Sequence, residues 1–183
     1  MNNFIAIDLG RSQIKSIDLH HNRFCFKSIH LPLCSVSTQT LSQLDKDLAA
    51  RIDNGKSYVY GDTALHLSET DFIIDGLNNS SFITDHSYLY TLFSIAKIIS
   101  ISKENDENIN VILGLSYTKE YEFSLTELTN RLKGNHTVEF LDLNETVLNS
   151  ISFTVTDIYK YLQPLPVIYN LFIKDNLSCD KED

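Results

Sequence analysis

The sequence predicts one α/β domain with a mixed central sheet that is opened by an antiparallel β-meander and flanked by helices. The first observation is that three short strand-like runs fill the first 32 residues, unlike the strand–helix–strand start of a Rossmann unit. The second is that helical and strand-like patterns alternate beyond residue 57. The third is size: 183 residues with 43% hydrophobic content suffice for one well-cored domain and are a tight fit for two.

The opening segment predicts three strands. Residues 3–9 are an apolar run that ends in Asp8-Leu9-Gly10, which indicates a buried strand followed by a turn. Residues 13–19 alternate between apolar and polar side chains, and the polar residues 20–22 predict a hairpin turn. A third strand is expected from Phe24 to Pro32.

The middle of the chain predicts a loop, a short strand and two helices. Residues 33–55 are rich in Ser and Thr and then charged, so we expect a loop with one helical turn. Residues 57–60 predict a strand, and residues 61–65 a turn leading into a helix. Apolar residues at helical spacing predict a longer helix over 85–100, followed by a polar loop over 103–108.

The last third predicts strands and helices in alternation. Residues 110–115 form an apolar strand, and a helix is expected from Ser124 to Lys133. Ser124 and Glu127 have capping-box spacing, and Gly134 stands at the C′ position that follows a helix.

Two further strands and a final helix complete the prediction. The strands are expected over 137–143 and 147–158, and the helix over 165–173, after Pro164.

Charge and cysteine content exclude several classes of function. The formal net charge is −9 and no basic run is present, which argues against a partner nucleic acid held directly through its phosphates. Cys25, Cys34 and Cys179 show no metal-ligand spacing, so we expect a reducing, cytoplasmic setting. No apolar run approaches membrane-spanning length and no leader-like segment opens the chain, so no membrane association is expected.

The segment Asp8-Leu9-Gly10-Arg11-Ser12-Gln13-Ile14-Lys15 is the best candidate for chemistry. A tight turn between the first two strands would aim backbone N–H groups at a phosphate, and Gly10 would allow close approach. Asp8 would hold Mg²⁺ through water, and Lys15 would meet a phosphate as a point charge. The alternative is an ordinary hairpin, because any strand–turn–strand can contain Asp, Gly and Lys.

Several segments, taken in order, resemble a known family. Residues 5–15 resemble the first phosphate loop of the actin and sugar-kinase superfamily. Later segments are similar to those of ParM/StbA-type bacterial actins, in the same order. They are Tyr60-Gly61-Asp62-Thr63-Ala64-Leu65, Val111-Ile112-Leu113-Gly114-Leu115-Ser116, residues 132–140 with the pattern LxGxHxVxF, and Gln163-Pro164-Leu165.

The resemblance implies an RNase H-like fold and the N-terminal half of an actin-like ATPase over residues 1–173, with a polar acidic tail over 174–183. It implies that Asp8 helps to hold the water shell of Mg²⁺, that Gly10, Arg11 and Ser12 lie along the phosphates of ATP or GTP, and that Lys15 touches them. Gln163 would orient the attacking water, since an amide orients water by hydrogen bonds but is too weak a base to take its proton.

The sequence departs from the pattern of this family in three places. Arg11 stands where a small residue is usual, so it would either crowd the phosphate or add a charge to it. Ser116 replaces a Pro, with little expected consequence. Pro166-Val167 replaces the Gly-Ala that follows the Gln, which puts the placement of Gln163 in question.

The family also has a second domain with another phosphate loop, and no glycine follows Gly134 here. We therefore expect the phosphates to be held from one side and the isolated chain to have little or no ATPase activity. The expected partners are a missing second ATPase half or copies of the chain in a filament, and a DNA-binding adaptor.

Three functions remain open from sequence. The first is nucleotide-dependent filament assembly in plasmid segregation. The second is a truncated, non-catalytic domain that binds or regulates a full-length filament protein, and the third is half of a small-molecule kinase of the same superfamily.

His136 is expected to be a structural residue at the start of a strand. A role as a catalytic base would require a carboxylate partner, and the sequence identifies none.

Overall fold

The computed structural model describes residues 3–10, 12–35, 49–67, 85–102, 107–116, 122–142 and 144–163. Its elements, in chain order, are β1 (Asn3–Leu9), β2 (Gln13–Asp18), β3 (Arg23–Lys27), β4 (His30–Pro32), η1 (Leu33–Ser35), β5 (Ala49–Ile52), β6 (Ser57–Tyr60), α1 (Gly61–Leu67), α2 (Asp85–Ser102), β7 (Asn108–Ser116), α3 (Glu122–Leu132), β8 (Gly134–Leu141) and β9 (Val147–Gln163).

The described strands form one mixed sheet in the order β3-β2-β1-β7-β9-β8-β5-β6-β4. β1, β7 and β9 run parallel, and the other pairs are antiparallel. The predicted α/β fold with an antiparallel opening is therefore confirmed.

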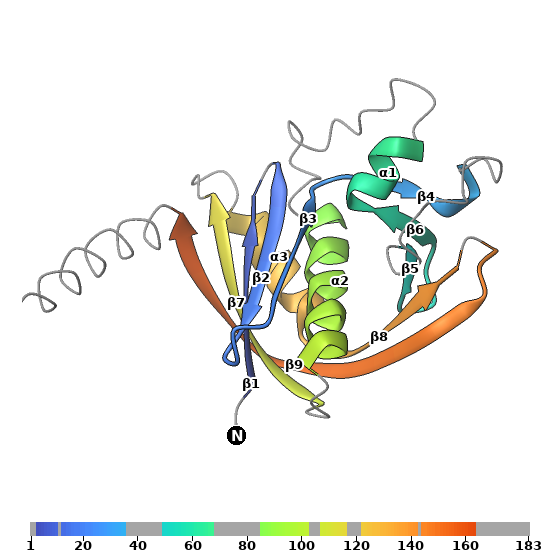
Figure 1. Cartoon of the computed structure of the whole chain (residues 1–183). Helices are drawn as coiled ribbons and strands as arrows, with labels where there is room; N and C mark the ends of the chain where they lie inside the picture. Colours follow the sequence, from blue (N-terminus) through green and yellow to red (C-terminus); the bar gives the residue numbers. More distant parts are fainter. Residues whose placement is uncertain are drawn as a thin grey trace, which may run out of the picture.

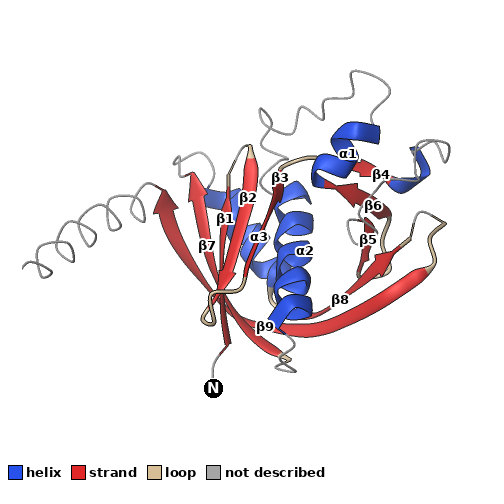
Figure 2. Cartoon of the chain, in the orientation of Figure 1, coloured by secondary structure: helices blue, strands red, loops and turns tan. Residues whose placement is uncertain are grey.

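The sheet curls around α2 (Figure 1). β3 and β4 form its opposite edges, yet only Ser28 and Ile29 separate them in sequence. The 17-residue strand β9 makes this curvature possible, because its first part pairs with β8 and its last part with β7 (Figure 2).

The main hydrophobic core lies on the concave face of the sheet. Alternation in β1 places Ile5, Ile7 and Leu9 in this core. The face of α2 that packs on them includes Phe93, whose ring stacks on Tyr60 with centroids 4.1 Å apart. α3 adds Leu128 and Leu132 to the same core, alongside α2. A smaller cluster lies where α1 meets β4 and β6; it comprises Leu31, Leu33, Ala49, Val59, Ala64 and Leu141.

The structure corrects the prediction in the first half of the chain. The single strand expected from Phe24 to Pro32 is two strands at opposite edges, because the chain turns away at Ser28. The loop expected over 33–55 contains η1, which is the helical turn that the sequence predicted. It also contains the strand β5, which the sequence did not predict.

Three boundaries in the second half also differ. α3 begins at Glu122, so Ser124 lies within its first turn and does not cap it. Gly134 follows the helix at the predicted position, with a φ of 118°, but it also begins β8. β9 continues five residues past Ile158, because alternating side chains extend the strand as far as Gln163.

The helix expected over 165–173 lies outside the described residues, as does the tail over 174–183. Among the residues that are described, none of the helices has the length and apolar character needed to span a bilayer.

Candidate functional site

A row of side chains crosses the convex face of the sheet near the carboxyl end of β1. The strand pairing aligns Cys25, Lys15, Asp8, Gly114 and Tyr161 on successive strands, from β3 to β9. Residues paired in this way point to the same side of a sheet. The row therefore faces away from the core that holds Ile7 and Leu9.

Asp8 is the central acid of this row and is partly buried. Burial raises the pKa of its carboxyl, and the positive charge of Lys15 on the neighbouring strand lowers it, with a net increase. Burial that disfavours the carboxylate is relieved when a cation comes close to it. Asp8 is therefore placed to gain from a bound metal ion or its water shell.

Gly114 keeps the space beside Asp8 clear. A Cβ at position 114 would lie 3.6 Å from the Oδ1 atom of Asp8, so any larger side chain would extend over the carboxylate. The sequence identified Gly114 only as part of a family-like segment, and its place next to Asp8 follows from the parallel pairing of β1 and β7.

The turn after β1 requires glycine at position 10. A Cβ there would lie 2.5 Å from the carbonyl oxygen of Gln13, a distance at which the backbone would have to move. The hydroxyl of Ser28 donates to the Gly10 carbonyl at 2.7 Å, and the Ser28 N–H donates to the Ser12 carbonyl at 3.2 Å. Ser28, the residue that follows β3, therefore holds this turn in place, a role that sequence reasoning missed.

Two of the remaining predicted site residues are exposed at the surface. Ser12 is exposed just before β2, and Lys15 is exposed within it. Arg11 lies outside the described residues.

Gln163 ends β9, where its backbone is paired in register with Ser116 of β7. Because β1, β7 and β9 are parallel, Asp8, Gly114 and Gln163 approach the same edge of the sheet. The structure describes the backbone of Gln163 and not its side chain, so the role expected for its amide remains a prediction.

The donor set suits a hydrated Mg²⁺ better than a metal held by protein ligands alone. Within the described ranges, no three His, Cys, Asp or Glu side chains converge to form a cage for a metal ion. Mg²⁺ usually keeps several waters and takes one or two carboxylates together with substrate phosphates. The single carboxylate of Asp8, next to a glycine that has no side chain to cover it, fits that mode of binding.

The fold indicates the class of the protein. An antiparallel meander runs into parallel strands, and a tight glycine turn joins the first two strands, as in the N-terminal half of an actin-like protein. Residues 6–165 match the family of actin like proteins, N-terminal domain, and the chain belongs to that family. A search of the curated proteins finds no match to the sequence.

Solved structures have the same fold. The ParM of a 15-stranded filament from Clostridium botulinum has a TM-score of 0.69 and 24% identity, over 96% of this chain and 52% of its own. A non-polymerisable quadruple mutant of pCBH ParM has a TM-score of 0.67 and 22% identity, over 92% and 49%. An archaeal actin homolog in complex with ADP has a TM-score of 0.57 and 11% identity, over 94% and 47%. The chain thus spans about half the length of these relatives.

Proposed function

We propose that this chain is the first half of an actin-like nucleotide-binding machine that assembles into filaments and takes part in plasmid segregation in the cytoplasm. The observation that carries the proposal is the row Lys15–Asp8–Gly114 at the carboxyl edge of parallel strands, beside the glycine turn at position 10. The family match over residues 6–165 favours this class over half of a small-molecule kinase.

The residues of the edge have separate tasks in this proposal. The backbone N–H groups of the turn at Gly10 and Ser12 bind the phosphates of ATP or GTP, and Lys15 adds a positive charge. Asp8 accepts hydrogen bonds from the water shell of Mg²⁺, which neutralises the phosphate oxygens when it is bound. Gln163 orients a water for attack through its amide.

Arg11 adds a second positive charge to the same turn in this proposal. We place the domain boundary at residue 173, with the acidic tail 174–183 outside the nucleotide-binding domain.

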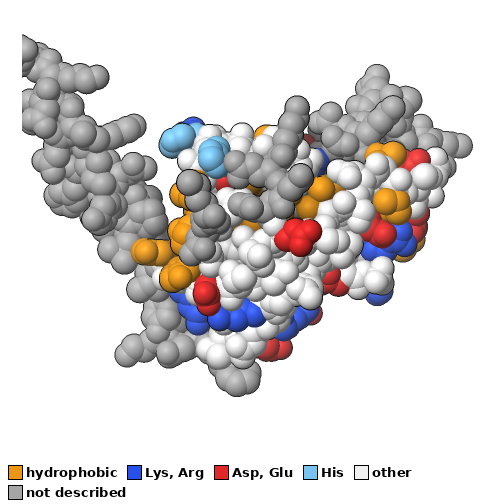
Figure 3. Space-filling model, turned by 90° about the horizontal axis from the view of Figure 1, so that it is seen from below, with side chains coloured by type: hydrophobic (Ala, Val, Ile, Leu, Met, Phe, Trp, Pro, Cys, Tyr) orange, Lys and Arg blue, Asp and Glu red, His pale blue; other side chains and the backbone are white. Residues whose placement is uncertain are grey.

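The site needs a second half to surround a nucleotide. This chain supplies one wall, and its relatives have about twice the length. Two tyrosines of β9 stand exposed on the convex face that carries the site, Tyr159 at 47% and Tyr161 at 50% exposure. Hydrophobic side chains gather on the left of Figure 3, where β7 and β9 lie, and they favour contact with a further domain or chain.

Self-association and DNA attachment complete the proposal. One relative is described as a filament and another as a mutant that does not polymerise, which supports assembly as the property of the class. The net charge of −9 favours attachment to plasmid DNA through a basic adaptor protein over direct contact with phosphates.

A second candidate function is a regulator that binds filaments of a full-length relative without turning nucleotide over. The departures from the family pattern at Arg11 and Pro166 favour it, because catalysis of phosphoryl transfer depends on closely placed groups around the phosphate. Such a regulator slows polymerisation of a full-length ParM-type protein in proportion to its concentration.

Sedimentation distinguishes these functions. The chain is centrifuged with Mg-ATP alone, and then with a full-length ParM-type protein, next to a Tyr159→Ser/Tyr161→Ser variant. Assembly that requires nucleotide supports the filament function, and slowed assembly of the relative supports the regulator. A chain that neither pellets nor alters the relative's assembly contradicts both.

A further inference from the structure

Asp8 and Tyr161 lie on either side of Gly114 on the convex face of the sheet. Asp8 is paired with Gly114 between β1 and β7, and Gly114 is paired with Tyr161 between β7 and β9. Neighbouring strands lie about 4.8 Å apart, so the backbones of Asp8 and Tyr161 are about 10 Å apart. Gly114 places no side chain between the Asp8 carboxylate and the Tyr161 ring.

The Tyr161 ring does not fill the space above Gly114. The three heavy atoms nearest to the position of a Cβ at residue 114 all belong to β1; they are Asp8 Cα, Asp8 Oδ1 and the Ile7 carbonyl oxygen, each at 3.6 Å. No atom of Tyr161 is therefore closer than 3.6 Å to that position, and the side chain of Tyr161 is half exposed. Tyr161 thus stands beside the space above Gly114 and is open to solvent.

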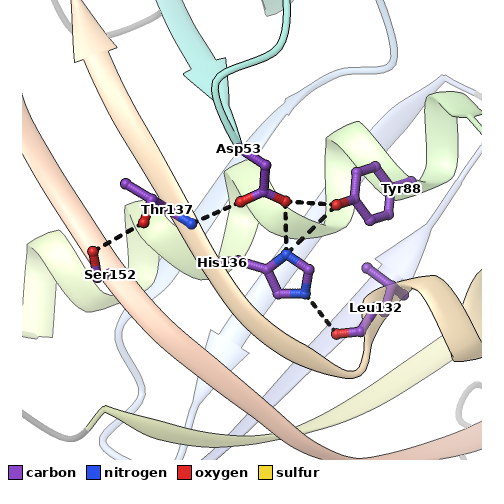
Figure 4. A network of polar contacts seen from close by, with 6 residues as sticks. All are labelled: Asp53, Tyr88, Leu132, His136, Thr137 and Ser152. Atoms are coloured by element: carbon purple, nitrogen blue, oxygen red, sulfur yellow. Dashed lines mark hydrogen bonds and ion pairs between the residues drawn. The ribbon is translucent and has the colours of Figure 1, made fainter.

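The Tyr161 hydroxyl is available to a ligand, since none of the described residues is hydrogen-bonded to it. The Tyr88 hydroxyl, by contrast, donates to Oδ2 of Asp53 at 2.6 Å (Figure 4). The same oxygen lies 2.8 Å from Nδ1 of His136, so Asp53 is the carboxylate partner of His136 that the sequence did not identify. Tyr88 therefore serves a network that joins the β5–β6 turn to α2 and β8, and Tyr161 has no such structural task.

A phosphate beside Asp8 needs hydrogen-bond donors. The Asp8 carboxylate only accepts hydrogen bonds and repels a phosphate, so binding depends on donors elsewhere in the row. Lys15 is such a donor on β2, one strand away from Asp8. Tyr161 is a second donor on β9, two strands away on the other side. A tyrosine side chain is longer than an aspartate, so its hydroxyl extends beyond the carboxylate, to the level of a phosphate that hydrated Mg²⁺ separates from Asp8.

On the basis of the nucleotide function proposed above, we propose that Tyr161 is a further binding residue of this edge, whose hydroxyl donates a hydrogen bond to a phosphate oxygen of the nucleotide. The phosphate lies over Gly114, with the Tyr161 hydroxyl on one side and Asp8 and Lys15 on the other. The neutral phenol of Tyr161 adds a directed hydrogen bond, whereas Lys15 adds a positive charge.

Tyr159 provides a matched comparison two residues earlier in β9. It lies on the same face and is exposed to a similar extent. It is paired with Ile112, and its ring centroid is 5.9 Å from that of Phe4. The residue of β1 in its row is Ala6 in place of an acid. Tyr159 therefore has apolar neighbours, and its hydroxyl should have no part in binding a phosphate.

Calorimetric titration of the whole chain with Mg-ATP tests the proposal on the wild type, Tyr161→Phe and Tyr159→Phe. Each substitution removes one exposed hydroxyl and keeps the ring, so the three melting temperatures should agree. We expect Tyr161→Phe to weaken binding about tenfold, as for the loss of one hydrogen bond to a charged group. Tyr159→Phe should bind Mg-ATP as the wild type does.

Titration with Mg-tripolyphosphate identifies the group that the hydroxyl contacts, because this ligand carries the phosphates without the nucleoside. Tyr161→Phe should weaken its binding by a factor similar to that for Mg-ATP. A loss of affinity for Mg-ATP with unchanged affinity for Mg-tripolyphosphate would place the hydroxyl on the nucleoside and would overturn the proposal.

Equal affinity of the wild type and Tyr161→Phe for Mg-ATP also overturns the proposal. So do equal losses in the two tyrosine variants, which would indicate an effect of the convex face as a whole. Lys15→Ala separates this failure from failure of the proposed function. Binding that is weakened by Lys15→Ala and unaffected by Tyr161→Phe overturns the role of Tyr161 alone, whereas a folded wild type that does not bind Mg-ATP overturns both.

Discussion

Gly114 lies beside Asp8 in the neighbouring parallel strand, and a Cβ at position 114 would be 3.6 Å from the Asp8 carboxylate oxygen. The absence of a side chain on β7 at this point therefore leaves room beside the acid on the convex face.

Gly114→Val should therefore block the site while preserving the fold. The first added carbon makes ordinary contacts at 3.6 Å, and a β-branched residue suits a strand, so the melting temperature should change little. The two further methyl groups would cover Asp8, and we expect affinity for Mg-ATP to fall about tenfold or more, about 1.4 kcal/mol. Calorimetric titration and thermal melting of the same samples measure both effects. Unchanged affinity would show that nucleotide does not use the space beside Asp8.

Gly10→Ala should damage both the fold and the site. The added Cβ would lie 2.5 Å from the Gln13 carbonyl oxygen, so the turn must shift. We expect a loss of about 1–3 kcal/mol in unfolding free energy, measured with denaturant. Gly114→Ala is the matched control, because its Cβ has room, and it should cost less. Equal losses at both positions would contradict the proposed turn geometry.

Ser28→Ala should loosen the phosphate turn with little effect on the core. The substitution removes the 2.7 Å hydrogen bond from the Ser28 hydroxyl to the Gly10 carbonyl and leaves the backbone bond to Ser12 in place. We expect a loss of about 1 kcal/mol in stability and faster amide exchange in residues 10–13. Exchange that rises equally across the whole sheet would instead indicate general destabilisation.

Acid should destabilise the protein through His30. This side chain is buried against Tyr90, with its Nδ1 atom 3.0 Å from the hydroxyl, and burial together with nearby His86 lowers the pKa of His30 to about 4. In the unfolded state His30 binds a proton near pH 6.5, so its contribution to the free energy of unfolding is fully present above that pH. As the pH falls from 6.5 to 4, this contribution decreases by at most about 1.4 kcal/mol per pH unit.

Denaturant unfolding at several pH values measures this slope. His30→Gln keeps a polar group for Tyr90 but does not titrate, so its stability should fall less between pH 6.5 and 4. His20→Gln, in the exposed hairpin turn, should retain the wild-type slope. If His30→Gln and the wild type lose the same unfolding free energy between pH 6.5 and 4, groups other than His30 cause the loss.

Side-chain patterns within single segments predicted the strands and helices that such patterns specify. The apolar run over residues 3–9 predicted β1, the alternation in residues 13–19 predicted β2, and the spacing of apolar residues predicted α2. β5 was missed because four residues make a weak pattern, and because its pairing with β8 reaches 88 residues along the chain, as between Arg51 and Glu139.

The residues of the candidate site likewise divide into those that are close in sequence and those that only tertiary contacts bring together. Asp8, Gly10 and Lys15 belong to one turn and its two strands, so the sequence brings them together. Gly114, Tyr161 and Ser28 reach the site only through strand pairing or a tertiary hydrogen bond, which no local pattern encodes. Asp53 and His136 are likewise 83 residues apart, and nothing in either segment marks the pair.

Calorimetric titration with Mg-ATP, next to Lys15→Ala, tests directly whether the turn between β1 and β2 binds phosphate. Lys15 is exposed and paired in register with Asp8, so its removal should leave the fold intact and weaken binding about tenfold or more. We expect saturable binding by the wild type, and lost or strongly weakened binding by the variant. Absence of binding by a folded wild-type sample, or equal binding by both proteins, would contradict a phosphate site at the Asp8–Lys15 turn.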